Sequence, residues 1–302
     1  MACNLLVILG PTASGKTKVG VEVAKSIDGE VISADSRQVY RGMNIGTGKD
    51  LTEYGPIPYH LIDIVDPGYE FNVFEFQRRF FETFKEIRGR KKLPILVGGT
   101  GLYLEAALKK YDLPEVSENL NLRQELAHLT LEELISRLQK GNPRLHNTTD
   151  LLDRKRVIRA IEVGESQPGD DRDLPTFPSL DPIIFGLRWP RNILRQRITE
   201  RLRSRLNQGL IEEVKGLHQA GVSYASLEFY GLEYEFLAQY LKGRLNKNDM
   251  LQKLNSAIHQ FAKRQETWFR RMERRGILIH WVEGSQNPAA AILGKIEEFS
   301  RQ

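Results

Sequence analysis

The sequence contains a single cysteine, Cys3, among its 302 residues. One thiol excludes a disulfide within the chain and a zinc site built on cysteines. No apolar run approaches the roughly 20 residues that a membrane-spanning helix needs. No basic segment with a cleavage site follows Met1, so the sequence predicts no secretory signal peptide. We therefore expect a cytoplasmic protein with no membrane partner.

Neither strong charge nor low complexity marks the chain. It is 40% hydrophobic and 27% charged, which is ordinary for a globular protein. Its length allows one large core and a second, smaller unit. The formal net charge of +5 is compatible with a nucleic-acid partner but does not by itself indicate one.

The strongest motif lies at residues 10–17, which read Gly-Pro-Thr-Ala-Ser-Gly-Lys-Thr and fit G-x-x-x-x-G-K-[ST]. An apolar run at 5–9 predicts a buried parallel strand before the motif, and an amphipathic pattern from Lys18 predicts a helix after it. Glycines let successive backbone N–H groups face one anion, Lys16 adds a charge, and the Thr17 hydroxyl suits Mg²⁺. The flanking elements argue against a chance match or a simple tight turn. The loop predicts a diphosphate or polyphosphate site without identifying the ligand.

A second candidate group follows the next predicted strand, which contains Val31 and Ile32 and ends at Asp35 and Ser36. In open α/β sheets, ligands bind at the carboxyl ends of the strands. Asp35 is therefore placed to act as a general base or as a metal-linked carboxylate. A turn or a helix cap formed by its side chain is the alternative. Further along, we expect His60 to form a structural hydrogen bond rather than to act in catalysis.

A second glycine-rich turn follows the buried strand expected at 93–97 and reads Gly-Gly-Thr-Gly at 98–101. Both glycine-rich turns should meet at one edge of the sheet. Thr100 can then donate a hydrogen bond to a substrate. Close packing of a helix on the strand also explains the glycine pair.

These signals predict an α/β fold, a P-loop NTPase-like parallel sheet flanked by helices, with an inserted helical domain. The core comprises residues 1–112 and 183–302, and the insertion comprises 113–182. Within the insertion, helical spacing spans 120–138, a Gly-Asn-Pro sequence follows at 141–143, another helix runs from Asp150 to 163, and a proline-rich linker covers 164–182. Outside it, we expect the following elements: an aromatic helix at 72–89, strands at 59–64, 183–187 and 277–282, and a last helix at 249–273.

Two basic segments suggest an anionic partner. Residues 191–217 form a helix or helix pair rich in arginine, which is either a binding face or simply a solvated one. The helix at 249–273 places basic residues next to Phe261, Trp268 and Phe269. Such a mixture suits phosphate contact with base stacking, although a core-packing helix with a solvated face shows it too.

Seven segments together make the chain resemble the tRNA dimethylallyltransferases, or tRNA isopentenyltransferases, of bacterial and cyanobacterial type. The segments are 10–17, 34–40, 43–49, 60–63, 97–103, 159–162 and 262–269. The resemblance implies transfer of a dimethylallyl group from dimethylallyl diphosphate to an adenosine exocyclic amine (N6). That adenosine lies next to the 3′ side of the anticodon in tRNAs that read UNN codons. The P-loop would then hold the leaving diphosphate.

The same resemblance implies roles for individual residues and partners. Asp35 would be the base, with Thr17 and Thr100 beside the reacting centre and Thr17 at a Mg²⁺ ion. The diphosphate would be held by Gly10, Thr12, Ala13, Ser14, Gly15, Lys16, Thr17, Lys49 and Arg159. The tRNA anticodon stem-loop would be contacted by Asp35, Ser36, Arg37, Gln38, Lys263, Arg264, Gln265 and Trp268, and by the helical insertion. We expect the enzyme to act as a monomer.

The sequence departs from the family pattern at three places. Residues 231–235 read Gly-Leu-Glu-Tyr-Glu, so Glu235 stands where the resemblance implies an arginine. A negative charge near a diphosphate weakens its binding unless Glu235 points away. Ile258 replaces a threonine, and the region after Glu162 is shortened and rich in proline.

Three other functions remain open at this stage. An adenylate isopentenyltransferase would use free nucleotide and would need neither the insertion nor the basic helix. A P-loop small-molecule kinase would share the loop but require ATP. A tRNA-binding protein without activity would bind RNA and turn nothing over.

Overall fold

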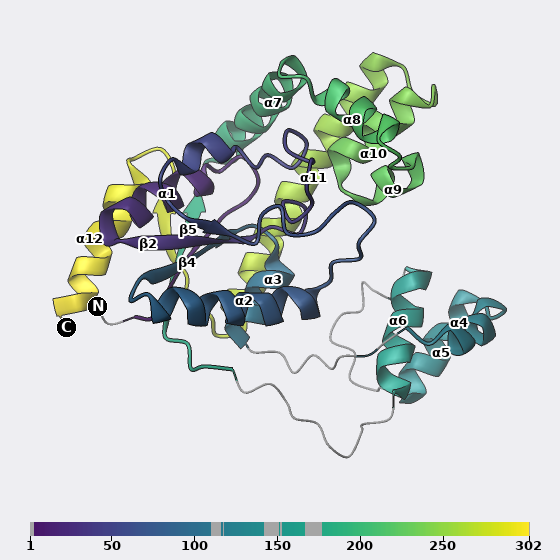
Figure 1. Cartoon of the computed structure of the whole chain (residues 1–302), viewed down its shortest axis with the longest axis horizontal. Helices are drawn as coiled ribbons and strands as arrows, with labels where there is room; N and C mark the ends of the chain where they lie inside the picture. Colours follow the sequence, from purple (N-terminus) through teal and green to yellow (C-terminus); the bar gives the residue numbers. More distant parts are fainter. Residues whose placement is uncertain are drawn as a thin grey trace. The chain divides into compact units, whose positions relative to one another are not determined.

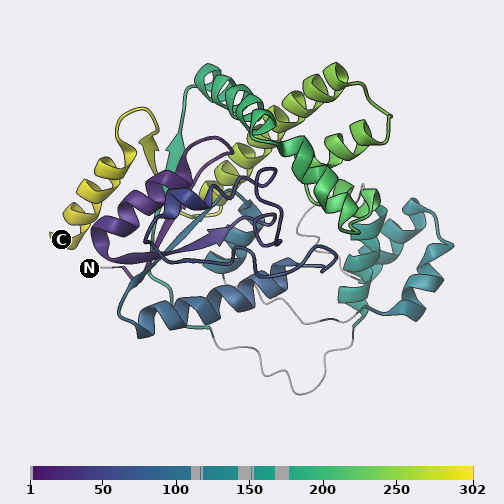
Figure 2. The same ribbon diagram turned by 45° about the horizontal axis from the view of Figure 1, so that its top comes forward.

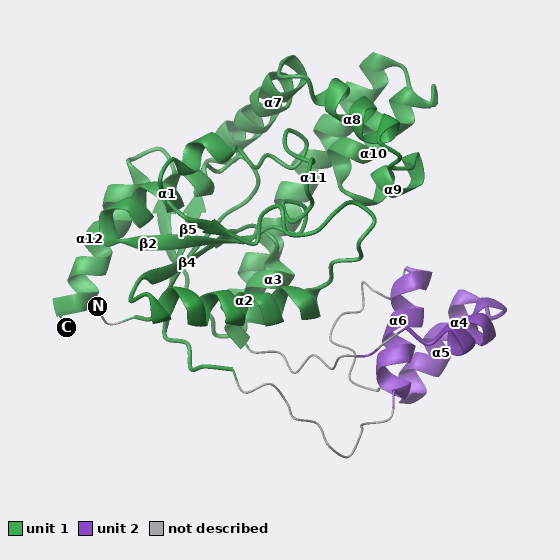
Figure 3. Ribbon diagram, viewed as in Figure 1, with its two compact units in different colours: residues 1–111, 177–302 green, residues 112–176 purple. Residues whose placement is uncertain are grey.

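The computed structural model describes residues 3–109, 116, 118–141, 151, 153–166 and 177–301. They form two compact units, Met1–Tyr111 with Phe177–Gln302 (unit 1) and Asp112–Thr176 (unit 2), coloured separately in Figure 3. The expected insertion, 113–182, extends beyond unit 2 at its second end. Phe177 belongs to unit 1, where its ring stacks on Phe81 with centroids 4.1 Å apart.

A single parallel sheet forms the centre of unit 1 and confirms the predicted α/β class (Figure 1). Its strand order is β3-β2-β4-β1-β5-β6, and all five neighbouring pairs are parallel. The strands are β1 (Leu5–Leu9), β2 (Gly29–Ala34), β3 (Tyr59–His60), β4 (Leu93–Gly98), β5 (Pro182–Arg188) and β6 (His280–Glu283). The expected strand at 59–64 is only two residues long, and the last strand begins three residues later than predicted.

Helices cover both faces of the sheet because alternate residues of the buried strands point to opposite sides. Leu5, Val7 and Leu9 of β1 join a core cluster with α2 (Val73–Gly89), α3 (Gly101–Lys109), α7 (Arg191–Asn207) and α11 (Lys247–Arg274). Leu6 and Ile8 join the opposite cluster with α1 (Lys16–Ile27) and α12 (Pro288–Arg301). Figure 2 shows α1 and α12 side by side. The aromatic residues of α2 are core residues, as predicted.

In unit 1, the structure decides between the two alternatives for one expected segment and corrects the position of another. The basic stretch 191–217 is a helix pair, because the chain turns at Gly209, whose φ of 98° is in the left-handed region that favours glycine. The helix expected to be the last, at 249–273, is followed by α12. The remaining helices are the 3₁₀ helix Leu51–Tyr54, α8 (Leu210–Gln219), α9 (Tyr224–Phe229) and α10 (Leu232–Leu241).

Unit 2 contains α4 (Leu120–Ala127), α5 (Leu131–Gly141) and α6 (Arg154–Glu165) around its own small core. The helical pattern expected at 120–138 is thus divided between two helices. Thr130 separates them: its hydroxyl accepts a hydrogen bond from the Glu133 N–H, and the Glu133 carboxylate accepts one from the Thr130 N–H. Asp153 caps α6, whose expected start at Asp150 lies outside the described residues, as do 142–143 and most of the proline-rich linker.

Candidate functional site

The P-loop lies between β1 and α1. Ala13 and Gly15 have φ angles of 61° and 86°, and this left-handed geometry lets the chain curl before α1 begins at Lys16. The first N–H groups of a helix have no acceptor within it and attract an anion. The buried Ser14 hydroxyl has no hydrogen-bond partner in the part of the chain that the structure describes. These free donors fit the predicted phosphate site.

Lys16 places its ammonium inside this loop. Its Nζ lies 3.4 Å from the Pro11 carbonyl oxygen. Burial lowers the pKa of Lys16 to about 8; nearby Asp35 opposes this shift, and nearby Arg201 and Arg205 reinforce it. The lysine therefore sits among like charges, an arrangement that a bound anion relieves.

Asp35 follows directly after β2. Its Oδ1 accepts hydrogen bonds from the N–H groups of Arg37 at 2.9 Å and Gln38 at 3.4 Å, so the side chain does form the turn considered as an alternative. Among the described residues, no group donates a hydrogen bond to its Oδ2. One oxygen thus fixes the carboxylate while the other stays available to accept a proton.

Thr100 joins the end of β4 to the end of β2. Its Oγ1 accepts a hydrogen bond from the Ser36 N–H at 3.2 Å, and its own N–H donates to the Ala34 carbonyl at 3.3 Å. The register pairs Gly98 of β4 with Leu9 of β1 on one side and Ala34 of β2 on the other. The structure therefore brings both glycine-rich turns and Asp35 to one edge of the sheet.

Gln265 of α11 connects those two turns. Its Oε1 accepts a hydrogen bond from the Thr12 N–H at 2.8 Å, and its Nε2 donates to the Gly99 carbonyl at 2.9 Å. A side-chain carbon on Gly99 would collide with the Gln265 amide, which explains the glycine. Both ends of the buried Gln265 amide bond within the protein, and its expected contact with a target base stays a prediction.

Gln38 and Lys49 also have structural partners. The buried Gln38 accepts a hydrogen bond from the Ser33 hydroxyl and donates to the Gly48 carbonyl, both at 3.0 Å. The fully buried Lys49 amine donates to the Tyr40 carbonyl at 2.6 Å and forms an ion pair with Asp63. The Gln38 amide thus bonds within the protein and the Lys49 charge is paired with Asp63, while their expected contacts with a base and with a diphosphate stay predictions.

Two arginines of α7 contact the P-loop and a third lies near enough to lower the pKa of Lys16, and none of them was assigned to the site from the sequence. Arg197 donates to the Ala13 carbonyl at 2.9 Å, and Arg201 donates to the Thr12 hydroxyl at 3.4 Å and to Asp50 at 3.2 Å. Arg205 lies one turn further along the same helix, beside Gly48. Their spacing of four residues was visible in the sequence, and places them on one face of a helix.

The side chains expected to contact tRNA differ in exposure. Lys263 and Arg264 are exposed on α11. The Arg37 guanidinium lies 5.1 Å from the centre of the exposed Phe229 ring. Trp268 is instead half-buried, and its indole nitrogen has no hydrogen-bond partner among the described residues. The Arg271 guanidinium lies 3.7 Å from the centre of its ring.

Arg159 lies in unit 2, where its guanidinium bonds to Glu162 at 3.1 Å and to the Val116 carbonyl at 2.6 Å. Its contact with a diphosphate therefore stays a prediction. His60 has the structural hydrogen bond expected of it, since its Nε2 lies 2.7 Å from Oε2 of Glu30. Glu235 lies in α10, where burial and the neighbouring Glu228 raise its pKa.

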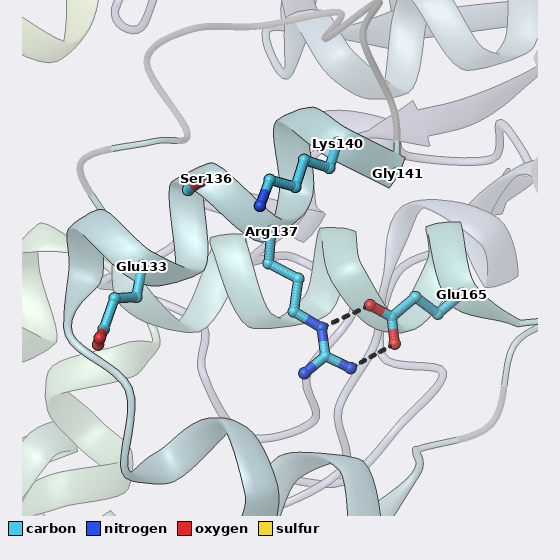
Figure 4. A pocket seen from close by; sticks show the side chains of 6 residues that line it. All are labelled: Glu133, Ser136, Arg137, Lys140, Gly141 and Glu165. Carbon is cyan, nitrogen blue, oxygen red and sulfur yellow. Dashed lines mark hydrogen bonds and ion pairs between the residues drawn. The ribbon is translucent and has the colours of Figure 1, made fainter.

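Unit 2 contains a hollow of about 610 Å³ that holds none of the predicted site residues (Figure 4). It is lined by Glu133, Ser136, Arg137, Lys140, Gly141 and Glu165. The Arg137 guanidinium forms a two-bond fork with Glu165, at 2.7 and 2.8 Å, and also bonds to Glu125. These carboxylates raise the pKa of Arg137 and occupy its donors, so the hollow is a weak candidate for anion binding.

The described residues contain no group of three or more His, Cys, Asp or Glu side chains that could hold a metal ion. None of the described helices is both long enough and apolar enough to cross a membrane.

Comparison with known proteins agrees with this geometry. The family model for IPP transferase matches residues 38–272, and the model for isopentenyl transferase matches residues 3–54. The first match thus runs from Gln38 to Met272. A tRNA dimethylallyltransferase 1 of Geotalea uraniireducens is 65% identical over 288 residues, or 95% of each chain. The protein of the same name from Geotalea daltonii is 64% identical and covers the whole of this chain and 98% of its own.

Two solved structures extend the comparison. The tRNA isopentenylpyrophosphate transferase of Bacillus halodurans aligns over 99% of this chain and 98% of its own, with a TM-score of 0.71 and 34% identity. A eukaryotic dimethylallyltransferase acting on tRNA aligns over 98% of this chain and 79% of its own, with a TM-score of 0.81. At 24% identity, the latter supports the fold alone. The sheet, the P-loop and these matches agree with the resemblance seen in the sequence, and the chain belongs to the IPP transferase family.

Proposed function

We propose that this protein transfers a dimethylallyl group from dimethylallyl diphosphate to the N6 amine of an adenosine in tRNA, releasing diphosphate. The adenosine is the one next to the 3′ side of the anticodon in tRNAs that read UNN codons. The observation that carries the proposal is the meeting of an anion-binding loop and a carboxylate, Asp35, at one sheet edge. The names and similarity of the full-length relatives support the same reaction.

In the proposed reaction, the diphosphate is bound by the N–H groups at the start of α1, the Ser14 hydroxyl and the Lys16 ammonium. The adenine nitrogen attacks the first carbon of the dimethylallyl group. The C–N bond forms, the C–O bond breaks, and the electron pair leaves with the diphosphate. Asp35 Oδ2 takes the proton that the amine loses. Thr100 helps to position the carboxylate by holding the Ser36 backbone.

The donors present fit a Mg²⁺ ion that is held largely by the substrate. Mg²⁺ keeps several waters and binds through one or two protein oxygens and substrate phosphates. Thr17 follows Lys16 in the first turn of α1 and offers one such oxygen. Asp35 offers a carboxylate close enough to shift the pKa of Lys16. A bound Mg²⁺ would neutralise charge on the diphosphate as it leaves.

We propose that the tRNA anticodon stem-loop is the acceptor and that the enzyme acts in the cytoplasm as a monomer. The exposed Lys263 and Arg264 are suited to phosphate contacts, because cations on one helix face bind the backbone without reading sequence. The target base has to leave its stack to reach Asp35. The exposed Phe229, with Arg37 on its ring, supplies a surface on which a base can stack.

The proposal is tested by incubating the full chain with dimethylallyl diphosphate, Mg²⁺ and an unmodified anticodon stem-loop, and by measuring the product mass. Parallel tubes replace the stem-loop with AMP, or the prenyl donor with ATP. Addition of one five-carbon group to the stem-loop alone is the expected result. Addition to AMP alone would instead indicate cytokinin synthesis, ATP-dependent phosphorylation would indicate a kinase, and no product would indicate a binding protein.

A further inference from the structure

Among the arginines of α7, Arg205 is the most buried. Its residue is 7% exposed. Nη1 donates to the Gly46 carbonyl at 3.4 Å and to Oε1 of Glu233 at 3.2 Å. Nη2 is also buried, but it has no hydrogen-bond partner among the residues that the structure describes. A buried donor without an acceptor is unfavourable, and charged donors are the most unfavourable.

A second guanidinium lies beside it. Gly48 has a φ of 64°, which favours glycine, and the Nη2 atoms of both Arg201 and Arg205 lie where its β-carbon would stand. Arg201 reaches from this point to the Thr12 hydroxyl of the P-loop. Arg201 therefore contacts both the P-loop and Gly48, against which the free nitrogen of Arg205 also lies.

Like charges meet in this small volume. Burial, followed by the charge of Arg201, lowers the pKa of Arg205 to about 10, although Glu233 opposes the shift. Arg205 in turn lowers the pKa of Lys16. The carboxylates nearby already have partners, since Asp50 binds Arg201 and Glu233 binds Arg205. One more anion in this volume would satisfy Nη2 and relieve the repulsion.

We infer that Arg205 is a ligand of the leaving diphosphate, with its free Nη2 donating to a phosphate oxygen of the group held by the P-loop. The inference rests on the proposed function for the identity of the anion. It adds a donor from α7 to those at the N-terminus of α1. The guanidinium stays protonated at pH values where Lys16 begins to lose its proton, so it keeps the site cationic in mild alkali.

The test measures binding of inorganic pyrophosphate to the full chain by calorimetry, with and without Mg²⁺. Arg205→Met removes the charge and the guanidinium donors but keeps an unbranched side chain that can pack in the same place. Arg203→Met is the matched control, because it makes the same change at an exposed position of the same helix. We expect Arg205→Met to weaken pyrophosphate binding roughly 10- to 100-fold. We expect Arg203→Met to stay within about threefold of the parent, as for an exposed charge. Equal binding by the parent and Arg205→Met would overturn the inference.

A second variant addresses the chance that Arg205→Met misfolds, which thermal melting and circular dichroism would reveal. Glu233→Gln keeps the side-chain shape but removes the charge that partly neutralises Arg205. Without the Glu233 carboxylate, the full charge of Arg205 acts on the bound anion. Pyrophosphate binding should therefore tighten about threefold or more. Glu212→Gln, at an exposed position of α8, is its control. Unchanged or weaker binding in Glu233→Gln would overturn the inference independently of Arg205→Met.

Binding of pyrophosphate by Arg205 and transfer of the prenyl group can each fail without the other. If the parent shows no prenyl transfer but binds pyrophosphate through Arg205, the proposed reaction fails and the anion site stands. If transfer occurs and Arg205→Met changes neither pyrophosphate binding nor the KM for dimethylallyl diphosphate, the reaction stands and the role of Arg205 fails. Absence of pyrophosphate binding in the parent would also overturn the inference.

Discussion

The arginines of the two units differ in what occupies their donors. In unit 2, Arg137 forks onto Glu165, Arg123 forks onto the buried Glu162, and Arg154 donates to three carbonyls at the ends of helix α4 and the following turn. In unit 1, Arg201 reaches the P-loop and Arg205 keeps a buried nitrogen free. Arginine therefore stabilises a small helical fold in one unit. In the other, two arginines of α7 place positive charge beside the P-loop, where we propose that it serves a ligand.

The carboxylates show the same difference and give the largest expected effect. Glu162 has both oxygens bound, whereas Asp35 has one oxygen in a turn and the other available. Asp35→Asn keeps an acceptor for the turn but removes the base, so turnover should fall by about 10²- to 10⁴-fold. Single-turnover transfer to the stem-loop measures it, and tRNA affinity should be retained.

Asp66→Asn provides the control for this substitution. Asp66 is exposed and paired only with the exposed Arg41, so turnover should not change. Survival of the Asp35→Asn activity within about tenfold of the parent would exclude Asp35 as the base, because a general base contributes more than that.

Lys16 gives the next largest effect, through pH. Because burial lowers its pKa to about 8, the free protein loses this charge as the pH rises from 7 to 9. Pyrophosphate affinity should therefore fall roughly tenfold over that range, and Lys16→Met should abolish most of the pH dependence. A slope that persists in Lys16→Met would place the titrating group elsewhere.

The lowered pKa of Lys16 also determines whether the stability of the fold rises or falls with pH. A lysine whose pKa falls from 10.5 on folding destabilises the fold while it is charged, below about pH 8. That cost fades as the pH rises from about 8 to 10.5. Lys16→Met should accordingly raise the melting temperature at pH 7, as expected at a functional site that sacrifices stability.

The smallest expected effect is a loss of stability in unit 2, and it tests whether the charged residues of the two units have different roles. Glu162→Gln removes the charge that binds Arg123 and Arg159, both of them partly exposed. Unit 2 should lose about 1–3 kcal/mol of stability, with faster hydrogen exchange in α6. Pyrophosphate binding by unit 1 should not change. Glu132→Gln at an exposed position is the control, and weakened pyrophosphate binding in Glu162→Gln would contradict the division of roles.

The sequence predicted the elements that local patterns determine. The P-loop, the strand before it, the parallel sheet and the convergence of both glycine-rich turns follow from apolar runs and from the rule for strand ends. The family also followed, because several separate segments matched in order. A helix was predicted correctly where its apolar residues repeat at helical spacing over many turns, as in α2. The helix α12, which follows the short strand β6, was not predicted.

Partner choice was not predictable in the same way. Gln38, Lys49 and Gln265 are polar residues near the site, yet each forms a hydrogen bond or an ion pair with another group of the protein. Whether a polar side chain serves a ligand or the fold depends on acceptors far away in sequence, such as the Gly99 carbonyl for Gln265. For the same reason, the basic stretch 191–217 did not indicate that Arg201 contacts the P-loop or that Arg205 lies beside Gly48.

The most direct measurement compares two stem-loops that differ at one nucleotide, with adenosine or inosine at the position next to the 3′ side of the anticodon. Inosine lacks the exocyclic amine that Asp35 is proposed to deprotonate. With dimethylallyl diphosphate and Mg²⁺, mass spectrometry should detect one added five-carbon group on the adenosine stem-loop and none on the inosine stem-loop. Equal addition to both would contradict the account, because the accepting atom would then lie elsewhere in the RNA.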